Sequence, residues 1–236
     1  MRLAIDTATD VASVAVGEPD RVEVAHPIRG ARQHAAQLLP LIRQVLKETG
    51  ATLEDITEIV VGDGPGSFTG LRIGWAAARG LAHDRGIPVA AVPSLLGAAH
   101  AANRGERGPV VACFDALRGQ VFGAIYEFGP GRVVAQVEPG LFTIEELVRL
   151  TPVRPDRAVG DGSESYREAL EAWIGNPVIP LSVLPPIASS LLRLADHEGA
   201  RRSLDDALAE PVYGRPAEAQ VKWEARHGRA LPHSPR

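Results

Sequence analysis

The residues with the clearest potential for chemistry lie in a glycine-rich run from Gly62 to Gly74, GDGPGSFTGLRIG. A short apolar run, Glu58 to Val61, precedes it, and a helical pattern from Phe68 to Arg85 follows it. This order predicts a strand, a tight turn and a helix. Backbone N–H groups at such a helix start attract phosphate groups. The candidates for nucleotide contact in this turn are Gly64, Gly66 and Ser67.

An acidic turn near the N-terminus supplies two further nucleotide candidates, Asp6 and Thr7. Two short β-rich runs flank the segment from Asp6 to Asp10, which predicts a hairpin. A second acidic turn, at Asp115, would face it if the chain folds like the two-lobed nucleotide-binding proteins, whose paired loops embrace phosphate. Ordinary turn chemistry also explains an aspartate at such a position. Both interpretations stay open.

Several kinds of catalytic site lack the residues they need. Ser67 does not stand in the G-x-S-x-G pattern of a hydrolase nucleophile, and no lysine precedes it as in a Walker loop. The seven histidines include no pair four residues apart, and the single cysteine, Cys113, lies in an apolar run. A thiol in such surroundings is inert. We therefore expect no catalytic residue, no metal site and no cofactor in this chain.

Length and charge limit the function classes further. The 236 residues suit two lobes of about 100 residues each. The net charge of −4 is spread along the chain, whereas a protein that binds nucleic acid alone normally carries a clustered basic surface. The basic tail from Lys222 to Arg236 is expected to be a solvated terminus. No apolar stretch reaches the roughly 20 residues of a membrane span, so we expect a cytoplasmic protein that binds no membrane.

The order of the expected elements predicts a duplicated α/β plan. Three strands, a helix, a strand, a helix, a strand and a helix occur first, and a similar set follows. The polar, glycine-rich segment 103–108 marks the boundary between the two halves. We therefore expect an N-terminal lobe of residues 1–102 and a C-terminal lobe of residues 103–236. The last segment is a candidate to return to the N-terminal lobe.

Small residues form a stripe in the helix that follows the glycine-rich turn. Each internal glycine costs roughly 1 kcal/mol relative to alanine, so a close contact should offset it. The stripe could pack on the chain's own sheet or dock on a second helix, and both alternatives stay open. The stripe and its apolar neighbours are Gly70, Leu71, Gly74, Trp75 and Ala78.

Five segments of the chain resemble the TsaB family, also called YeaZ. Its members are bacterial partner subunits of the tRNA threonylcarbamoyladenosine machinery. The segments are LAIDTAT at 3–9, HAAQLLPLI at 34–42, GPGSFTGLRIG at 64–74, FDALRGQVF at 114–122 and PVYGRPAEA at 211–219. The segment GPGSFTGLRIG is the most specific of the five for this family. The chain departs from the family where Ala116-Leu117 replaces the common Ala-Arg, and where Gly214 replaces a frequent leucine.

The resemblance implies an actin/Hsp70-like (ASKHA) fold, with two lobes that are each a mixed sheet flanked by helices. It also implies a non-catalytic dimerisation subunit of the tRNA N6-threonylcarbamoyladenosine (t6A) synthesis complex. Such a subunit pairs with and activates a TsaD-like transferase, works in a complex with a TsaE-like ATPase, and forms a homodimer when alone. It meets tRNA only through the complex.

The resemblance also implies where the partner binds, namely on the helices expected at 33–49 and 68–85. The interface would combine the small-residue stripe of the second helix with the apolar residues Leu38, Leu41, Ile42 and Val45 of the first. Two other classes of function remain as alternatives. One is an enzyme that acts alone, either a glycoprotease-like peptidase or an ATPase, and the other is a free nucleotide-binding module.

Overall fold

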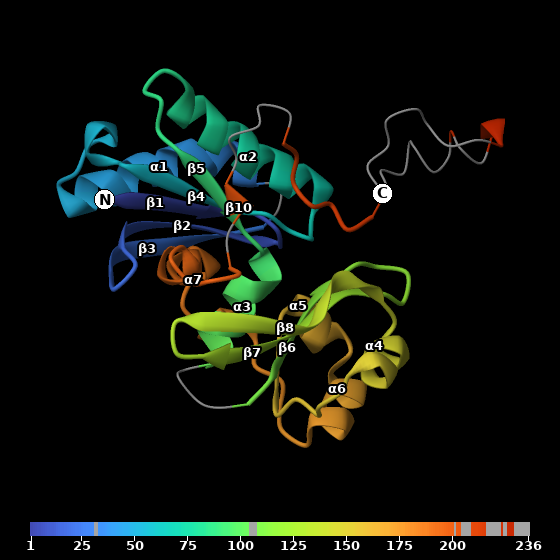
Figure 1. Cartoon of the computed structure of the whole chain (residues 1–236). Helices are drawn as coiled ribbons and strands as arrows, with labels where there is room; N and C mark the ends of the chain where they lie inside the picture. The colour runs from blue at the N-terminus through green and yellow to red at the C-terminus, as the bar shows by residue number, and fades with distance from the viewer. Residues whose placement is uncertain are drawn as a thin grey trace.

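The structure is a computed structural model that describes residues 1–30, 33–103, 108–200, 202–203, 209–215, 223 and 226–228. Most of the expected boundary segment 103–108, the end of the segment 211–219 and most of the basic tail lie outside these residues. Two lobes are visible, one above the other (Figure 1).

The first lobe is built on a six-stranded mixed sheet with the strand order β10-β5-β4-β1-β2-β3. Strands β1, β2 and β3 pair antiparallel in sequence order, while β4 and β5 lie parallel to β1. The short strand β10, from the far end of the chain, closes the other edge by pairing antiparallel with β5. The bounds are β1 Arg2–Asp6, β2 Val11–Glu18, β3 Arg21–Arg29, β4 Glu58–Gly62, β5 Val89–Val92 and β10 Arg202–Ser203.

The second lobe repeats this plan on a smaller scale. Its four-stranded sheet has the order β8-β7-β6-β9, in which three antiparallel strands are followed by a strand, β9, that lies parallel to the first of them. The duplicated α/β plan predicted from the sequence is thus confirmed, as is the fold class of two mixed sheets flanked by helices. The bounds are β6 Val110–Asp115, β7 Val121–Gly129, β8 Arg132–Phe142 and β9 Arg157–Val159.

Helices fill three layers around the two sheets. Helices α1 and α2 cover the outer face of the first sheet, α7 and α3 lie between the sheets, and α4, α5 and α6 cover the far face of the second (Figure 1). The bounds are α1 His34–Thr49, α2 Phe68–His83, α3 Ser94–Asn103, α4 Ile144–Leu150, α5 Asp161–Ser165, α6 Arg167–Ile174 and α7 Ile187–Leu194, with short 3-10 turns at Leu53–Asp55 and Leu181–Val183.

Side-chain alternation in β1 explains the layers. Leu3 and Ile5 join the apolar cluster that α1 and α2 cover, whereas Ala4 between them joins the cluster with α3 and α7. Successive side chains of a strand point to opposite faces. Asp6 therefore points, like Ala4, toward α3. Its carboxylate consequently lies in the layer between the two sheets.

Candidate functional site

The glycine-rich turn between β4 and α2 fits tightly under the β1–β2 turn. The Ser67 N–H donates to the Ala8 carbonyl oxygen at 2.7 Å, and Ser67 Oγ accepts from the Gly70 N–H at 3.1 Å, which caps α2. A Cβ atom at Gly66 would overlap the Ala8 carbonyl, and one at Gly70 would overlap the Thr7 carbonyl. These glycines therefore allow two backbone segments of the same chain to meet.

Asp6 is completely buried and fully engaged within the chain. Its carboxylate accepts a hydrogen bond from Ser94 Oγ at 2.6 Å and one from the Ala8 N–H at 3.3 Å. Burial raises the pKa of Asp6 to about 6, although both hydrogen bonds act against the rise. Gly62 makes room for this group, because a Cβ there would overlap the carboxylate. Asp6 thus ties β1 to the start of α3.

The five nucleotide candidates do not gather on one surface. Thr7 is buried with its hydroxyl against Gly74, and Gly64 lies against the Val212 carbonyl. Of the five, only Gly66 and Ser67 line the space between the lobes. The sequence predicted all five candidates to lie in or beside turns. The side chains of Asp6 and Thr7, however, point into the protein and are engaged there.

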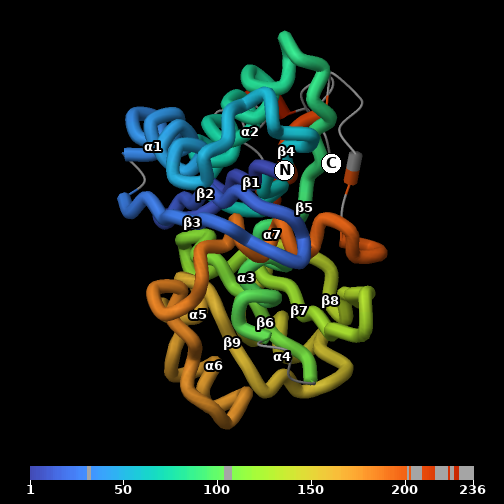
Figure 2. The backbone as a smooth tube through the Cα atoms, turned by 90° about the vertical axis from the view of Figure 1, so that its left-hand side faces the viewer, coloured from blue at the N-terminus to red at the C-terminus, as the bar shows by residue number. Residues whose placement is uncertain are grey.

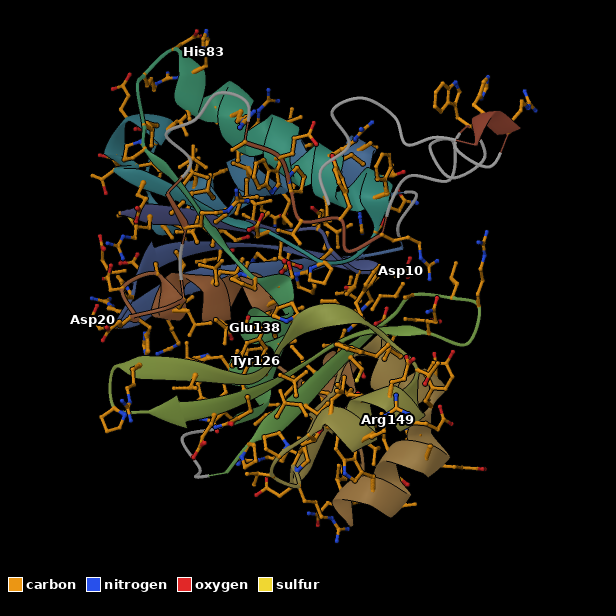
Figure 3. All side chains as sticks on the ribbon, turned by 45° about the vertical axis from the view of Figure 1, so that its right-hand side comes forward. Asp10, Asp20, His83, Tyr126, Glu138 and Arg149 are labelled. Atoms are coloured by element: carbon orange, nitrogen blue, oxygen red, sulfur yellow. The ribbon has the colours of Figure 1, made fainter. Side chains whose placement is uncertain are left out.

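A cleft of about 680 Å³ opens between the two lobes, and its walls are mostly apolar. It lies where the β1–β2 turn and the start of α2 face the β6–β7 turn. Figure 3 shows Asp10 on the side of the first lobe that faces the second. The apolar and aromatic lining residues are Ala8, Phe68, Phe114, Ala116, Leu117, Phe122 and Tyr213.

Carboxyl groups dominate the polar part of this lining. Asp10, Asp115 and Asp161 border the cleft, while Arg215 is the one basic side chain among its described lining residues. Asp161 Oδ1 accepts from the N–H groups of Asp115 at 3.1 Å and Gly162 at 2.9 Å. Burial nevertheless raises the pKa of Asp161 to about 6, and the negative charge of Asp115 adds to the rise. The cleft is therefore apolar with an acidic edge.

The predicted interface stripe of α2 faces the chain's own sheet. Gly70, Leu71, Gly74, Trp75 and Ala78 are all buried. A Cβ at Gly74 would overlap the Thr7 hydroxyl, and Trp75 Nε1 donates to the Gly62 carbonyl at 3.2 Å. In this chain the stripe packs on the first sheet and its β1–β2 turn, and its part in a partner interface stays a prediction.

The interface residues expected on α1 also point inward. Leu38, Leu41, Ile42 and Val45 are at most 9% exposed and join the cluster between α1, α2 and the first sheet. Hydrophobic periodicity identifies the face that a helix buries in its own fold, so the part of these residues in a partner interface stays a prediction. The outer faces of the same two helices are exposed.

The outer faces of α1 and α2 lie side by side (Figure 2). Beside them a groove of about 720 Å³ runs between α1, the turn that follows it and the end of α2, and apolar side chains make up most of its walls. Leu39, on α1, is 47% exposed at this groove. Its lining includes Leu39, Ile42, Leu46, Leu53 and Leu81, with Arg43 and Lys47 at its rim.

Metal-binding clusters and membrane-spanning helices are both absent from the described residues. No three His, Cys, Asp or Glu side chains within that part of the chain lie where they could hold a metal ion. None of its helices has the length and apolar character that crossing a bilayer demands. Cys113 is buried, and burial raises the pKa of its thiol to about 12.

Comparisons with known proteins agree with the architecture. A family model described as TsaD, tRNA N6-adenosine threonylcarbamoyltransferase, matches residues 24–171. The tRNA threonylcarbamoyladenosine biosynthesis protein TsaB of Escherichia coli K12 is 40% identical over 232 residues, which cover 96% of this chain and 98% of that protein. TsaB of Bacillus subtilis 168 is 31% identical over 94% of this chain and 96% of its own length.

The chain belongs to the TsaB family. Among solved structures, a Pseudomonas aeruginosa protein described as similar to peptidase YEAZ superposes with a TM-score of 0.75 at 30% identity, covering 91% of this chain and 99% of that one. YeaZ from P. aeruginosa gives a TM-score of 0.68 at 32% identity, over 82% and 90% of the two chains.

The segments that carry the TsaB resemblance have distinct structural roles. The segment 64–74 joins the first sheet to α2, whereas 114–122 forms the β6–β7 turn at the cleft. In that turn Leu117 has a φ of 60° and is 67% exposed. Gly214, a departure from the family, has a φ of 68° and lies so close to Pro65 and Phe122 that a side chain would overlap them. This packing explains a glycine at position 214.

The segment 209–215 of the TsaB-family chain holds α2 through contacts that the sequence did not predict. Arg72 Nε donates to Tyr213 Oη at 3.1 Å, and the Tyr213 ring lies 4.6 Å from that of Phe68. Arg79 donates to the carbonyl of Ala209. These partners are more than 100 residues apart, and no local pattern signals them. The segment PVYGRPAEA was the one available clue, because it marked this stretch without showing what it contacts.

Proposed function

We propose that this chain is a non-catalytic dimerisation subunit of the t6A synthesis complex, which pairs with and activates a TsaD-like transferase. The observation that carries the proposal is the pair of neighbouring, outward helix faces on α1 and α2, in a chain that belongs to the TsaB family. The relatives from E. coli and B. subtilis are described as tRNA threonylcarbamoyladenosine biosynthesis proteins.

The composition of the outer faces supports helix pairing. Small residues allow the backbones of two helices to come close, and exposed apolar side chains supply contact area. Arg43 and Lys47 add positive charge at the rim, so the matching partner surface should carry acidic residues. The exposed or half-exposed residues include Ala35, Ala36, Leu39 and Arg43 on α1, with Arg72, Ile73, Ala76, Ala77 and Gly80 on α2.

Internal engagement of the reactive groups supports the non-catalytic part of the proposal. Asp6 is hydrogen-bonded to Ser94, and Ser67 caps α2 through its Oγ. Cys113 is a buried thiol whose pKa is raised to about 12, so the thiolate form is scarce at neutral pH. A subunit of this kind would contribute surface and stability to a complex whose chemistry belongs to the transferase.

The proposal extends to the remaining members of the assembly. A TsaE-like ATPase would join the pair, tRNA would be held through the complex, and the chain would form a homodimer through the same helix faces when the transferase is absent. All of this would take place in the cytoplasm. The homodimer and the heterodimer with the transferase would then compete for the same outer faces of α1 and α2.

The direct test is co-expression of the chain with the TsaD-like transferase of the same organism, followed by size-exclusion chromatography with light scattering. We expect a stable heterodimer, and a t6A-forming activity of the transferase that rises when the chain is added. The chain alone should hydrolyse neither ATP nor peptide. Failure to co-elute, together with hydrolysis that Asp6→Asn or Ser67→Ala abolishes, would replace the proposal with the enzyme alternative.

A further inference from the structure

The cleft between the lobes has its own binding chemistry, different from that of the groove beside α1 and α2. Its volume of about 680 Å³ lies within the range of about 300–1,000 Å³ that is typical of ligand sites. Leu117 projects at its edge with 67% of its surface exposed and with a positive φ of 60°. Exposed apolar side chains held in such a backbone conformation concentrate at binding sites.

The charges of the cleft disfavour an anionic ligand. Asp10, Asp115 and Asp161 border it, against the single cation Arg215 among the described lining residues, and that guanidinium donates to Gln120 Oε1 at 2.9 Å. The start of α2 also borders the cleft, but Ser67 Oγ already accepts its Gly70 N–H. A phosphate placed here would meet carboxylates at close range. A cation would be attracted.

Two neighbouring carboxylates favour a guanidinium over an ammonium, whereas the aromatic pair beside them already holds a cation of this chain. Phe68 and Tyr213 form a ring pair at the cleft, and the chain's own Arg72 already stacks on it, with Cζ 4.1 Å from the Phe68 centroid and 5.6 Å from the Tyr213 centroid. A guanidinium is planar, weakly hydrated and able to donate to two carboxylate oxygens at once, whereas an ammonium is a compact and strongly hydrated charge.

We propose that the interlobe cleft binds an arginine side chain presented by a peptide segment of a partner protein. The guanidinium would donate to the Oδ2 atoms of Asp115 and Asp161, because their Oδ1 atoms already accept backbone N–H groups. An apolar neighbour of the arginine would cover Leu117 and the nearby Phe122 ring. This contact would be additional to helix pairing, and it can be tested whether or not α1 and α2 bind a partner.

The test is an NMR titration of the uniformly ¹⁵N-labelled chain with the peptide acetyl-Arg-Phe-amide. The matched probe is acetyl-citrulline-Phe-amide, which has nearly the same shape without the charge. We expect the arginine peptide to shift the amide signals of Ala116, Leu117 and Gly162, and to bind about tenfold more tightly than the citrulline peptide, because charge-assisted hydrogen bonds are roughly twice as strong as neutral ones.

Substitutions of the two aspartates test whether the arginine peptide binds in the cleft. Asp161→Asn and Asp115→Asn should each reduce the preference for the arginine peptide to less than about threefold, since each removes one charged acceptor. Asp20→Asn, on the opposite side of the first lobe (Figure 3), should leave the preference unchanged. The comparison of the two peptides on the unaltered chain stands even if a variant folds poorly.

Three results would overturn the proposal. Equal binding of the two peptides would show that charge does not matter, and the absence of any shift at the cleft would show that no such site exists. ADP, titrated in the same way, should leave these amides unmoved. Stronger shifts from ADP than from the arginine peptide would make the cleft a nucleotide site.

Discussion

Arg202 holds the buried carboxylate of Asp63 with two nitrogens, Nη2 donating to Oδ1 at 2.8 Å and Nε donating to Oδ2 at 3.2 Å. Asp63 follows β4, whereas Arg202 begins β10, so the pair fastens the end of the chain to the first sheet. Burial raises the pKa of Asp63, and Arg202 opposes that rise. These hydrogen bonds stabilise the two-residue strand β10 at the edge of the first sheet.

Removal of Arg202 should destabilise the protein. Arg202→Ala leaves the Asp63 carboxylate, 5% exposed, without its cation, and we expect the free energy of unfolding to fall by about 1–3 kcal/mol. Urea unfolding followed by circular dichroism measures this change. Arg21→Ala, at an exposed position of β3, is the matched control and should cost less than about 0.5 kcal/mol. An equal decrease in the unfolding free energy of the two variants would show that the Arg202–Asp63 ion pair does not stabilise the fold.

The internal glycines of α2 should respond in opposite ways to alanine. At Gly74 a Cβ would overlap the Thr7 hydroxyl, so Gly74→Ala should lower the free energy of unfolding by about 1–3 kcal/mol. At Gly80 nothing lies within 4 Å of the new Cβ, so Gly80→Ala should raise it by roughly 0.5–1 kcal/mol through helix propensity. Thermal and urea unfolding of both variants provide the measurement, and effects of the same sign would contradict this packing.

Asp6 should make stability depend on pH between about pH 4 and pH 6. Its pKa is about 6 in the fold and 3.8 in the unfolded reference, so the folded chain binds more protons over this window. Stability from this group is therefore present at low pH and is lost as the pH rises through 6. Asp6→Asn should remove this part of the slope, worth up to about 3 kcal/mol.

Urea unfolding at several pH values between 4 and 7 checks the expected slope. The measured quantity is the difference in unfolding free energy between Asp6→Asn and the unaltered chain, which cancels other groups such as Asp161. Asp20→Asn, at an exposed turn, is the control. A difference that stays constant across the window would show that Asp6 does not titrate as expected.

The sequence predicted the elements more reliably than it predicted their faces. Periodicity located α1 and α2, and short apolar or β-rich runs located β1 and β4, because these patterns reflect what each element buries in its own fold. The same rule does not show which face of a helix meets a partner. Trp75 and Ala78 are apolar and regularly spaced because they pack on the first sheet, whereas Ala76 and Gly80 are small, exposed and unremarkable in a sequence.

The candidate cleft was only partly predictable. The acidic turn at Asp115 was identified, and the glycine-rich turn bordering the cleft was recognised. Asp161 joins them because β9 pairs with β6, and Tyr213 joins them because its ring packs on Phe68. Such contacts join residues far apart in sequence, and no spacing rule specifies them. The sequence also does not show in which direction a turn side chain points. Asp6 and Asp115 both occur in acidic turns, but Asp6 is buried whereas Asp115 borders the cleft.

If the outer faces of α1 and α2 bind a TsaD-like transferase, a substitution on the outer face of α2 should weaken the affinity of the chain for that transferase. Ala76→Arg places a large cation on the exposed face of α2, while Ala169→Arg makes the same change on the exposed face of α6 in the second lobe. Isothermal titration against the transferase should show Ala76→Arg binding at least about 100-fold more weakly, as expected for loss of a tightly packed contact. Ala169→Arg should bind like the unaltered chain. Unchanged affinity of a correctly folded Ala76→Arg variant would show that this face of α2 does not bind the transferase.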